Sequence, residues 1–201
     1  RSRPASTRPA APKPAFIGQS VWRYNFRRPP EVTCLRAYEG PIGMGLVPLS
    51  ETLMYMYVTT PEPGNPWYAK DQLAAAMRSK LANVPPDIAA LRDQITDNEA
   101  VVYRPLEWLF LEGPWHKGRV VLLCDAAHAT TPHLGQGAGM AIEDSVVLGE
   151  EIASKADVES ALAALTHAGH QAASQQVPEH IARARDAVLR VVVTLPSTDP
   201  D

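Results

Sequence analysis

The sequence predicts a mixed α/β (α+β) fold, with an antiparallel sheet in its first half and a strand, a glycine turn and helices in its second half. Short β-type segments separated by proline and glycine fill residues 16–103, which is the spacing of an antiparallel sheet. A short apolar run at 120–124 precedes glycines at positions 135, 137 and 139. The residues after these glycines follow helical periodicity.

The first half is expected to form a domain spanning residues 15–112. Residues 1–14 before it are rich in Pro, Ala, Arg and Ser, which predicts an extended, poorly ordered arm. Strands are expected at 17–26, 32–38, 44–48, 52–59 and 100–104. One helix is expected over 71–81 with Asp71 as its N-cap, and Pro86 with Asp87 should open a shorter helix.

The run at 120–124 consists of β-formers without a polar interruption, which predicts a strand covered on both faces. Asp125 follows at the carboxyl end, which is the edge where open α/β sheets bind ligands. A carboxylate there can accept hydrogen bonds from sugar-like hydroxyls. The three glycines then let the backbone approach an anionic ligand and present its N–H groups.

A helix is expected to begin near Gly137, with its positive dipole end facing the turn. Apolar residues at helical spacing are expected to face inward, while Glu143, Asp144, Glu150 and Glu151 lie on or near the other face. The expected inward set is Met140, Ala141, Val146, Val147, Leu148 and Ile152. Asp157 is expected to cap a helix over 158–176, Pro178 to break it, and 179–193 to form a last helix.

The second half carries a long motif that resembles the second flavin-binding motif of FAD-dependent aromatic hydroxylases. These are single-component flavoprotein monooxygenases similar to salicylate, urate and hydroxybenzoate hydroxylases. The motif consists of Asp125, Ala126, Ala127, His128, Pro132, Gly135, Gln136, Gly137, Gly139, Glu143 and Asp144. The resemblance implies a partial FAD-binding Rossmann-like domain at 113–201 and an antiparallel-sheet substrate domain at 15–112.

The resemblance also implies roles for these residues. Asp125 would hold the ribityl chain of FAD. The flavin ring would lie along Pro132 and the turn, which is made of Gly135, Gln136, Gly137, Ala138 and Gly139. NAD(P)H would be the co-substrate and a small aromatic or N-heteroaromatic molecule the substrate. Because the cofactor carries the oxidation chemistry, no catalytic acid or base is assigned.

The sequence departs from the family pattern at two places. Cys124 stands where the family usually has glycine, directly before Asp125. The family's GxGxxG turn, which binds the adenosine diphosphate half of FAD, does not occur in the 201 residues. We therefore expect the C-terminal portion of such an enzyme, which self-associates or pairs with a missing N-terminal half.

Composition narrows the remaining possibilities. The formal net charge of −3 gives no basic patch for nucleic acid, and no apolar run is long enough to cross a membrane. Two cysteines far apart give no disulfide framework, which favours a reducing compartment and a cytoplasmic location. His128 and His133 lack a third ligand at a recognised spacing, so no metal is expected.

A substrate pocket would need flat apolar walls with a few hydroxyls. The expected wall residues are Met44, Leu46, Tyr57 and Tyr103. Two other functions stay open. One is a non-catalytic remnant that binds a small aromatic or a partner chain. The other is a flavin-dependent oxidoreductase of the same fold that performs halogenation or another oxidation.

Overall fold

The computed structural model describes residues 12–38 and 42–190. Most of the expected N-terminal arm and residues 191–193 of the last expected helix lie outside the described residues. The chain divides into two compact units, whose described parts are 16–38, 42–106 and 183–190 for the first and 12–15 and 107–182 for the second. The boundary that we expected from the sequence lies between residues 112 and 113.

The first unit is built on a five-stranded sheet with the order β2-β3-β4-β1-β5. Its strands are β1 (Ala15–Arg27), β2 (Arg36–Tyr38), β3 (Gly43–Pro48), β4 (Leu53–Pro61) and β5 (Val102–Trp108). The pairs β2–β3, β3–β4 and β1–β4 are antiparallel. The predicted antiparallel sheet is therefore confirmed.

The strand expected at 32–38 is shorter than predicted, because only β2 remains of it. The Val32 N–H donates a hydrogen bond to the Pro29 carbonyl at 3.1 Å, which closes a turn after the two prolines. Val32 is also 2% exposed and fills the core from this turn. The β-branched side chain of Val32 therefore packs in the core from a turn and is not part of a strand.

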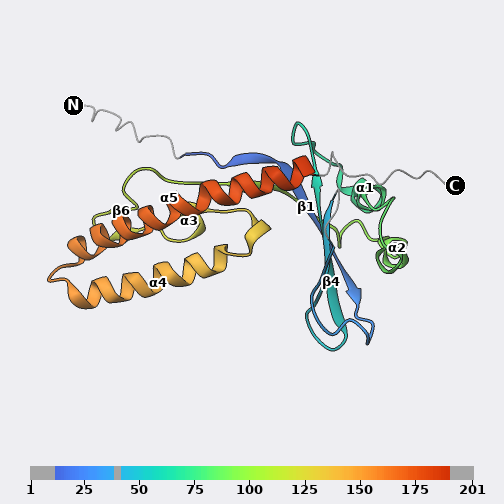
Figure 1. Ribbon diagram of the computed structural model, residues 1–201, viewed down its shortest axis with the longest axis horizontal. Coiled ribbons are helices and arrows are strands. Elements are labelled where there is room, and N and C mark those ends of the chain that lie inside the picture. Colours follow the sequence, from blue (N-terminus) through green and yellow to red (C-terminus); the bar gives the residue numbers. More distant parts are fainter. Residues whose placement is uncertain (1–11, 39–41, 191–201) are drawn as a thin grey trace, which may run out of the picture. The chain divides into compact units, whose positions relative to one another are not determined.

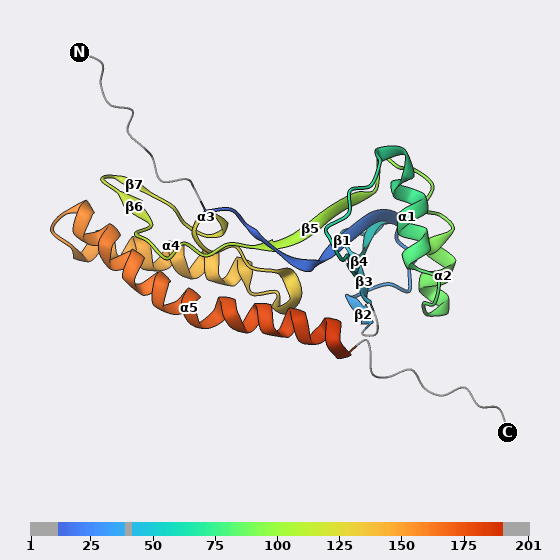
Figure 2. The ribbon, with the colours of Figure 1, turned by 90° about the horizontal axis from the view of Figure 1, so that it is seen from above.

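Helices α1 (Leu73–Lys80) and α2 (Pro86–Arg92) lie together on one side of this sheet (Figure 2). Pro86 opens α2 as predicted. Asp71, however, is not the N-cap of α1, because it lies within a 3-10 turn, Lys70–Gln72, that precedes the helix. Asn98 takes over part of this role, since its Oδ1 accepts a hydrogen bond from the Ala74 N–H at 2.8 Å.

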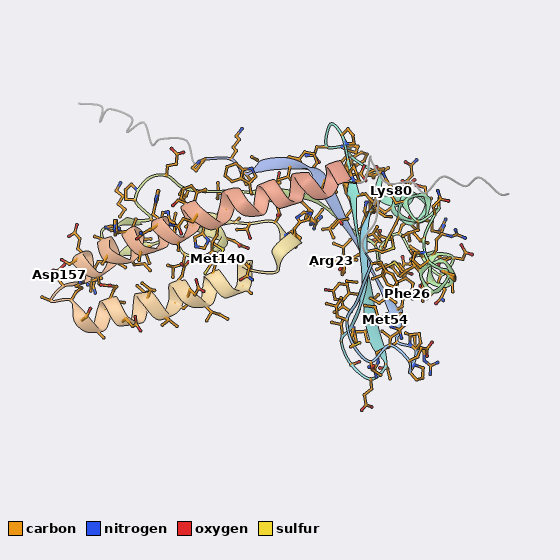
Figure 3. All side chains as sticks on the ribbon, in the orientation of Figure 1. Arg23, Phe26, Met54, Lys80, Met140 and Asp157 are labelled. Atoms are coloured by element: carbon orange, nitrogen blue, oxygen red, sulfur yellow. The ribbon has the colours of Figure 1, made fainter. Side chains whose placement is uncertain are left out.

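Strand β4 alternates between two environments. Met54, Met56 and Val58 are fully buried and belong to the core formed with α1 and α2, as predicted for the methionines. Tyr55 and Tyr57 alternate with them and therefore point to the opposite face. Figure 3 shows the same division, with Phe26 and Met54 on the helix side of the sheet and Arg23 on the other side.

The second unit contains a small ladder and two long helices. Strands β6 (His116–Lys117) and β7 (Val120–Val121) form a two-stranded sheet. A short helix, α3 (Asp125–His128), and a 3-10 turn, Pro132–Leu134, lead into α4 (Gly137–Ser154). Helix α4 then lies beside the first part of α5 (Val158–Arg190) (Figure 1).

The predicted buried strand at 120–124 is wrong in extent and in burial. Only Val120 and Val121 pair with β6, and the chain turns into α3 four residues later. Val120 is 70% exposed and Leu122 is 42% exposed. Within the described residues no further strand flanks β7, so nothing covers the β-formers on both sides.

The inward face of α4 also differs from the prediction. Asp144 is buried, whereas Val146 and Ile152 are about half exposed and Ile142 is 65% exposed. The Asp144 carboxylate can be buried because it accepts a hydrogen bond from the Cys124 N–H and pairs with His128 inside the unit. The exposed residues lie on a face of α4 that no other described element covers.

Helix α5 is continuous, so the predicted break at Pro178 is wrong. Proline fits helical φ and removes one backbone donor, and buried Ala173 and Val177 hold the preceding turn against the core of the unit. The predicted cap is confirmed, since Asp157 Oδ1 accepts a hydrogen bond from the Ser160 N–H at 2.8 Å. None of the helices in the described part of the chain is both long and apolar enough to span a bilayer.

Candidate functional site

The candidate site begins at a sharp corner between β7 and α3. Cys124 occupies this corner with φ 54° and ψ −137°, a conformation that costs a residue with a side chain about 1–3 kcal/mol. This is the position where the family resemblance leads us to expect glycine. Burial, together with the Asp144 and Asp125 carboxylates, raises the pKa of the Cys124 thiol. At neutral pH the thiol is therefore protonated and is not a nucleophile.

Asp125 follows the corner as the first residue of α3, and its side chain is exposed. It therefore lies at a helix start, although the sequence placed it at the end of a longer strand. An exposed carboxylate directly after a strained corner has a fixed backbone and free oxygen atoms. Such a group can accept hydrogen bonds from the hydroxyls of a ligand.

The glycine turn connects the 3-10 turn to α4. Gly135 has φ 64°, in the left-handed region, and its N–H bonds the Pro132 carbonyl at 3.0 Å. A Cβ built on Gly135 would meet no atom within 4 Å, so the space above the turn is open. Gln136, Gly137, Ala138 and Gly139 continue the turn into the first residues of α4. Pro132, Gln136 and Ala138 are exposed on the way.

No side chain in the described residues caps the N-terminus of α4. The first N–H groups of a helix have no partner inside the helix, and the helix dipole adds positive charge there. The open turn, the uncapped helix start and the exposed Asp125 carboxylate together fit an extended ligand that carries hydroxyls and an electron-rich ring. FAD is a ligand of this kind.

Behind the turn lies a buried pair that the sequence did not reveal. Asp144 Oδ2 accepts a hydrogen bond from the Cys124 N–H at 3.0 Å and lies 2.7 Å from His128 Nε2. The Trp115 ring packs against His128, with 5.1 Å between ring centroids. The signal that could have found Asp144 is its spacing, four residues after Met140 and three before Val147, which places it on the buried stripe.

A hollow of about 80 Å³ opens beside this pair, between α4 and α5. Its lining is mainly apolar and consists of His128, Met140, Glu143, Asp144, Val147, Leu165, Ala168, Gly169, Ala172 and Ala173. Among the described residues, no three His, Cys, Asp or Glu side chains gather so that they could hold a metal ion.

The four residues expected to line a substrate pocket lie in different places of the first unit. Met44 and Leu46 belong to the core between the sheet and its helices. The Tyr103 ring packs against Trp22 at 4.3 Å, and its hydroxyl bonds the Pro66 carbonyl. Of the four, only Tyr57 lies on the face of the sheet opposite α1 and α2.

On that face the Tyr57 ring lies directly over Gly45. A Cβ on Gly45 would come within 2.5 Å of the Tyr57 ring, so the close approach requires glycine. The Arg23 guanidinium lies 5.9 Å from the centre of the neighbouring Tyr55 ring. Tyr55, Tyr57 and Arg23 thus give this face aromatic surface with a positive charge beside it. We call it the tyrosine face.

Another buried network, also absent from the sequence predictions, supports the first unit. Lys80 Nζ lies 2.9 Å from Glu62 Oε1, and the hydroxyls of Thr60 and Tyr68 donate to the same carboxylate at 2.7 and 2.8 Å. Burial alone would raise the pKa of Glu62, but the hydrogen bonds from Lys80, Thr60 and Tyr68 together lower it. The carboxylate is therefore ionised at neutral pH.

Comparison with known proteins agrees with the geometry. The family described as "FAD binding domain" matches residues 17–180, and the chain belongs to this family. YetM of Bacillus subtilis (strain 168), whose name assigns FAD-dependent monooxygenase activity only provisionally, is 34% identical over 151 residues. That match covers 74% of this chain and 41% of YetM.

Two further similar proteins have names that include a substrate. The FAD-dependent urate hydroxylase of Klebsiella pneumoniae is 36% identical over 124 residues, covering 59% of this chain and 31% of that protein. The crystal structure of Klebsiella pneumoniae HpxO with FAD and uric acid has a TM-score of 0.79 at 23% identity, over 90% of this chain and 48% of that one. The chain thus spans half or less of the length of these relatives. The solved structure confirms the predicted fold.

Proposed function

We propose that the chain works as one part of a FAD-dependent monooxygenase that hydroxylates an aromatic or N-heteroaromatic small molecule with NAD(P)H and dioxygen. The observation that carries this proposal is the match to the FAD-binding family over residues 17–180, which includes the corner, Asp125 and the glycine turn. The curated relatives support the reaction class, because their names describe FAD-dependent monooxygenases and urate hydroxylases.

When bound, FAD supplies the redox chemistry, and the chain supplies binding, orientation and electrostatics. Asp125 would hold the ribityl chain by accepting a hydrogen bond from one of its hydroxyls. The N–H groups of Gly137, Ala138 and Gly139 would stabilise negative charge on the flavin. Pro132, Gly135 and Gln136 would provide contacts for the ring.

The tyrosine face is the surface we assign to the substrate in the first unit. The Tyr55 and Tyr57 rings offer flat apolar contacts, and Arg23 offers a positive charge for an electron-rich or acidic ring. Met44, Leu46 and Tyr103 then act indirectly, since they belong to the packing on the helix side that fixes the backbone of β3 and β5. The low cysteine content supports a cytoplasmic location.

Titration of the purified chain with FAD, followed by flavin fluorescence, tests the proposal. We expect saturable but weak binding, at micromolar concentrations or above, because the chain has no GxGxxG turn for the adenosine half. Asp125→Ala should weaken it by about 1–3 kcal/mol, the range for losing a charged hydrogen-bond partner, which is roughly 5- to 150-fold. Asp93→Ala, an exposed carboxylate of the first unit, is the matched control.

Absence of saturable FAD binding would contradict the proposal and favour the non-catalytic remnant. The strained Cys124 is the observation that favours this alternative, since the corner holds a side chain in a backbone conformation that favours glycine. FAD binding with steady NAD(P)H oxidation, but without hydroxylation of phenols or purines, would instead favour another flavin-dependent oxidation such as halogenation. Sub-micromolar affinity would show that the chain holds a complete cofactor site.

A further inference from the structure

One oxygen atom of Asp144 joins two parts of the corner. Asp144 Oδ2 accepts the Cys124 N–H at 3.0 Å and pairs with His128 Nε2 at 2.7 Å. Asp144 is 6% exposed and His128 is 3% exposed, so water does not replace either contact readily. Hydrogen bonds to a buried charged group are among the stronger ones in proteins.

The corner needs such an interaction. Cys124 has φ 54°, where residues with a side chain are strained, and the structure must hold it there. The hydrogen bond from its N–H to Asp144 fixes one side of this peptide group, and the Ala126 N–H binds the Leu123 carbonyl on the other side at 3.1 Å. Asp144 comes from α4, so the strained corner and the start of the glycine turn are tied to the same helix.

His128 is held from the other side as well. Its ring packs on Trp115, which is 1% exposed and donates its Nε1–H to the Leu111 carbonyl at 3.0 Å. Gly169 of α5 leaves room for that indole, because a Cβ there would come within 2.3 Å of the Trp115 ring. Helices α4 and α5 thus hold the His128 ring between Asp144 and Trp115.

We propose that Asp144 and His128 are positioning residues for Asp125. Asp125 lies between Cys124 and His128, the two residues that Asp144 binds, so the carboxylate of α4 fixes both ends of the short segment that presents it. The role as a flavin anchor rests on the function proposed above. The clamp, by which we mean the contacts of Asp144 with Cys124 and His128, rests on the geometry alone.

A double-mutant cycle separates this role from general stabilisation. Asp144→Asn keeps the shape and an oxygen that can accept both hydrogen bonds, but it removes the charge. Cys124→Gly removes the strain that the charge offsets. If Asp144 holds the strained corner, its charge matters less once residue 124 is glycine.

Amide hydrogen exchange in peptides covering residues 122–130 reads the corner directly. We expect Asp144→Asn to speed exchange there about tenfold, the factor that corresponds to roughly 1.4 kcal/mol. The same substitution in the Cys124→Gly background should speed it by less than about threefold. Equal effects in the two backgrounds, or no effect in either, would overturn the proposal.

His116→Phe is the matched control. His116 Nδ1 lies 3.1 Å from Thr166 Oγ1, so this variant also removes a histidine contact to a helix of the same unit but leaves the contacts of Asp144 in place. We expect its effect on exchange at 122–130 to be small and equal in both backgrounds. If His116→Phe speeds exchange at 122–130 as much as Asp144→Asn does, exchange in this segment reflects only the stability of the whole unit.

FAD titration of the same variants tests the consequence for the cofactor. We expect Asp144→Asn to weaken FAD binding about tenfold, with most of the loss recovered in the Cys124→Gly double variant and none in His116→Phe. Unchanged affinity in Asp144→Asn, with altered exchange, would overturn the positioning role. If the unaltered chain binds no FAD, the proposed function fails and the flavin role with it. Coupled exchange effects would still establish the clamp.

Discussion

The buried carboxylate of Glu62 gives the sharpest stability prediction. Its side chain is 3% exposed and accepts hydrogen bonds from Lys80, Thr60 and Tyr68. Glu62→Gln keeps the shape but leaves the Lys80 ammonium with a neutral partner. Loss of a charged hydrogen bond costs about 1.5–3 kcal/mol. Because the Lys80 side chain is 26% exposed and can regain some water, we expect about 2 kcal/mol.

The pH dependence has a definite sign. The folded pKa of Glu62 lies below its unfolded value, so the ionised carboxylate stabilises the unit above the unfolded pKa of about 4.3. That contribution is lost as the pH falls through the lower, folded pKa. Urea unfolding at a series of pH values should therefore show a difference between Glu62→Gln and the original chain that is full at pH 7 and shrinks below about pH 4.

Glu99→Gln is the matched control for this experiment. Glu99 pairs with Lys70 at the surface, where both side chains are more than two-thirds exposed, and such pairs contribute about 0–1 kcal/mol. A loss for Glu62→Gln no larger than that of Glu99→Gln would refute the reasoning. A pH-independent difference would also refute it, because the effect would then come from packing rather than charge.

Three further variants test other parts of the chain. Asp157→Ala removes the N-cap of α5, so helical content measured by circular dichroism should fall. In the original chain the same cap should weaken as the pH falls through the lowered pKa of Asp157. Gly169→Val places atoms inside the Trp115 ring, so urea unfolding should show a loss of about 1–3 kcal/mol, and an unchanged midpoint would contradict the contact. Ile142→Glu with Val146→Glu should reduce self-association in sedimentation velocity without loss of folding, and equal sedimentation of both forms would mean that this face of α4 binds no second copy.

The sequence predicted the sheet well because its signals are local. Alternation of Met54, Tyr55, Met56 and Tyr57 has the period of a strand, and β4 follows it residue by residue. The long flavin motif likewise predicted the family, because its glycines and Asp125 have a fixed spacing. The helix that Pro86 opens was also predicted correctly, since that signal lies at the first helical position.

The features that the sequence missed depend on contacts between distant residues. Asp144 was expected on the polar face because of its residue type, although its helical spacing places it on the buried stripe. Its partners, the Cys124 N–H and His128, are reported by no local pattern. The cap of α1 is provided by Asn98, 24 residues away. Pro178 was read as a break because its local penalty was weighed without the packing of the turn before it. Tertiary contacts decided each of these cases.

The strict alternation along β4 separates the residues that stabilise the core from the residues that form the opposite surface. Met54, Met56 and Val58 carry the stability of the sheet, while Tyr55, Tyr57 and Thr59 occupy the other face and contribute little to that core. Evolution or a directed library can therefore randomise the second set while folding is preserved by the first. One backbone can diversify its aromatic surface this way without first acquiring extra stability.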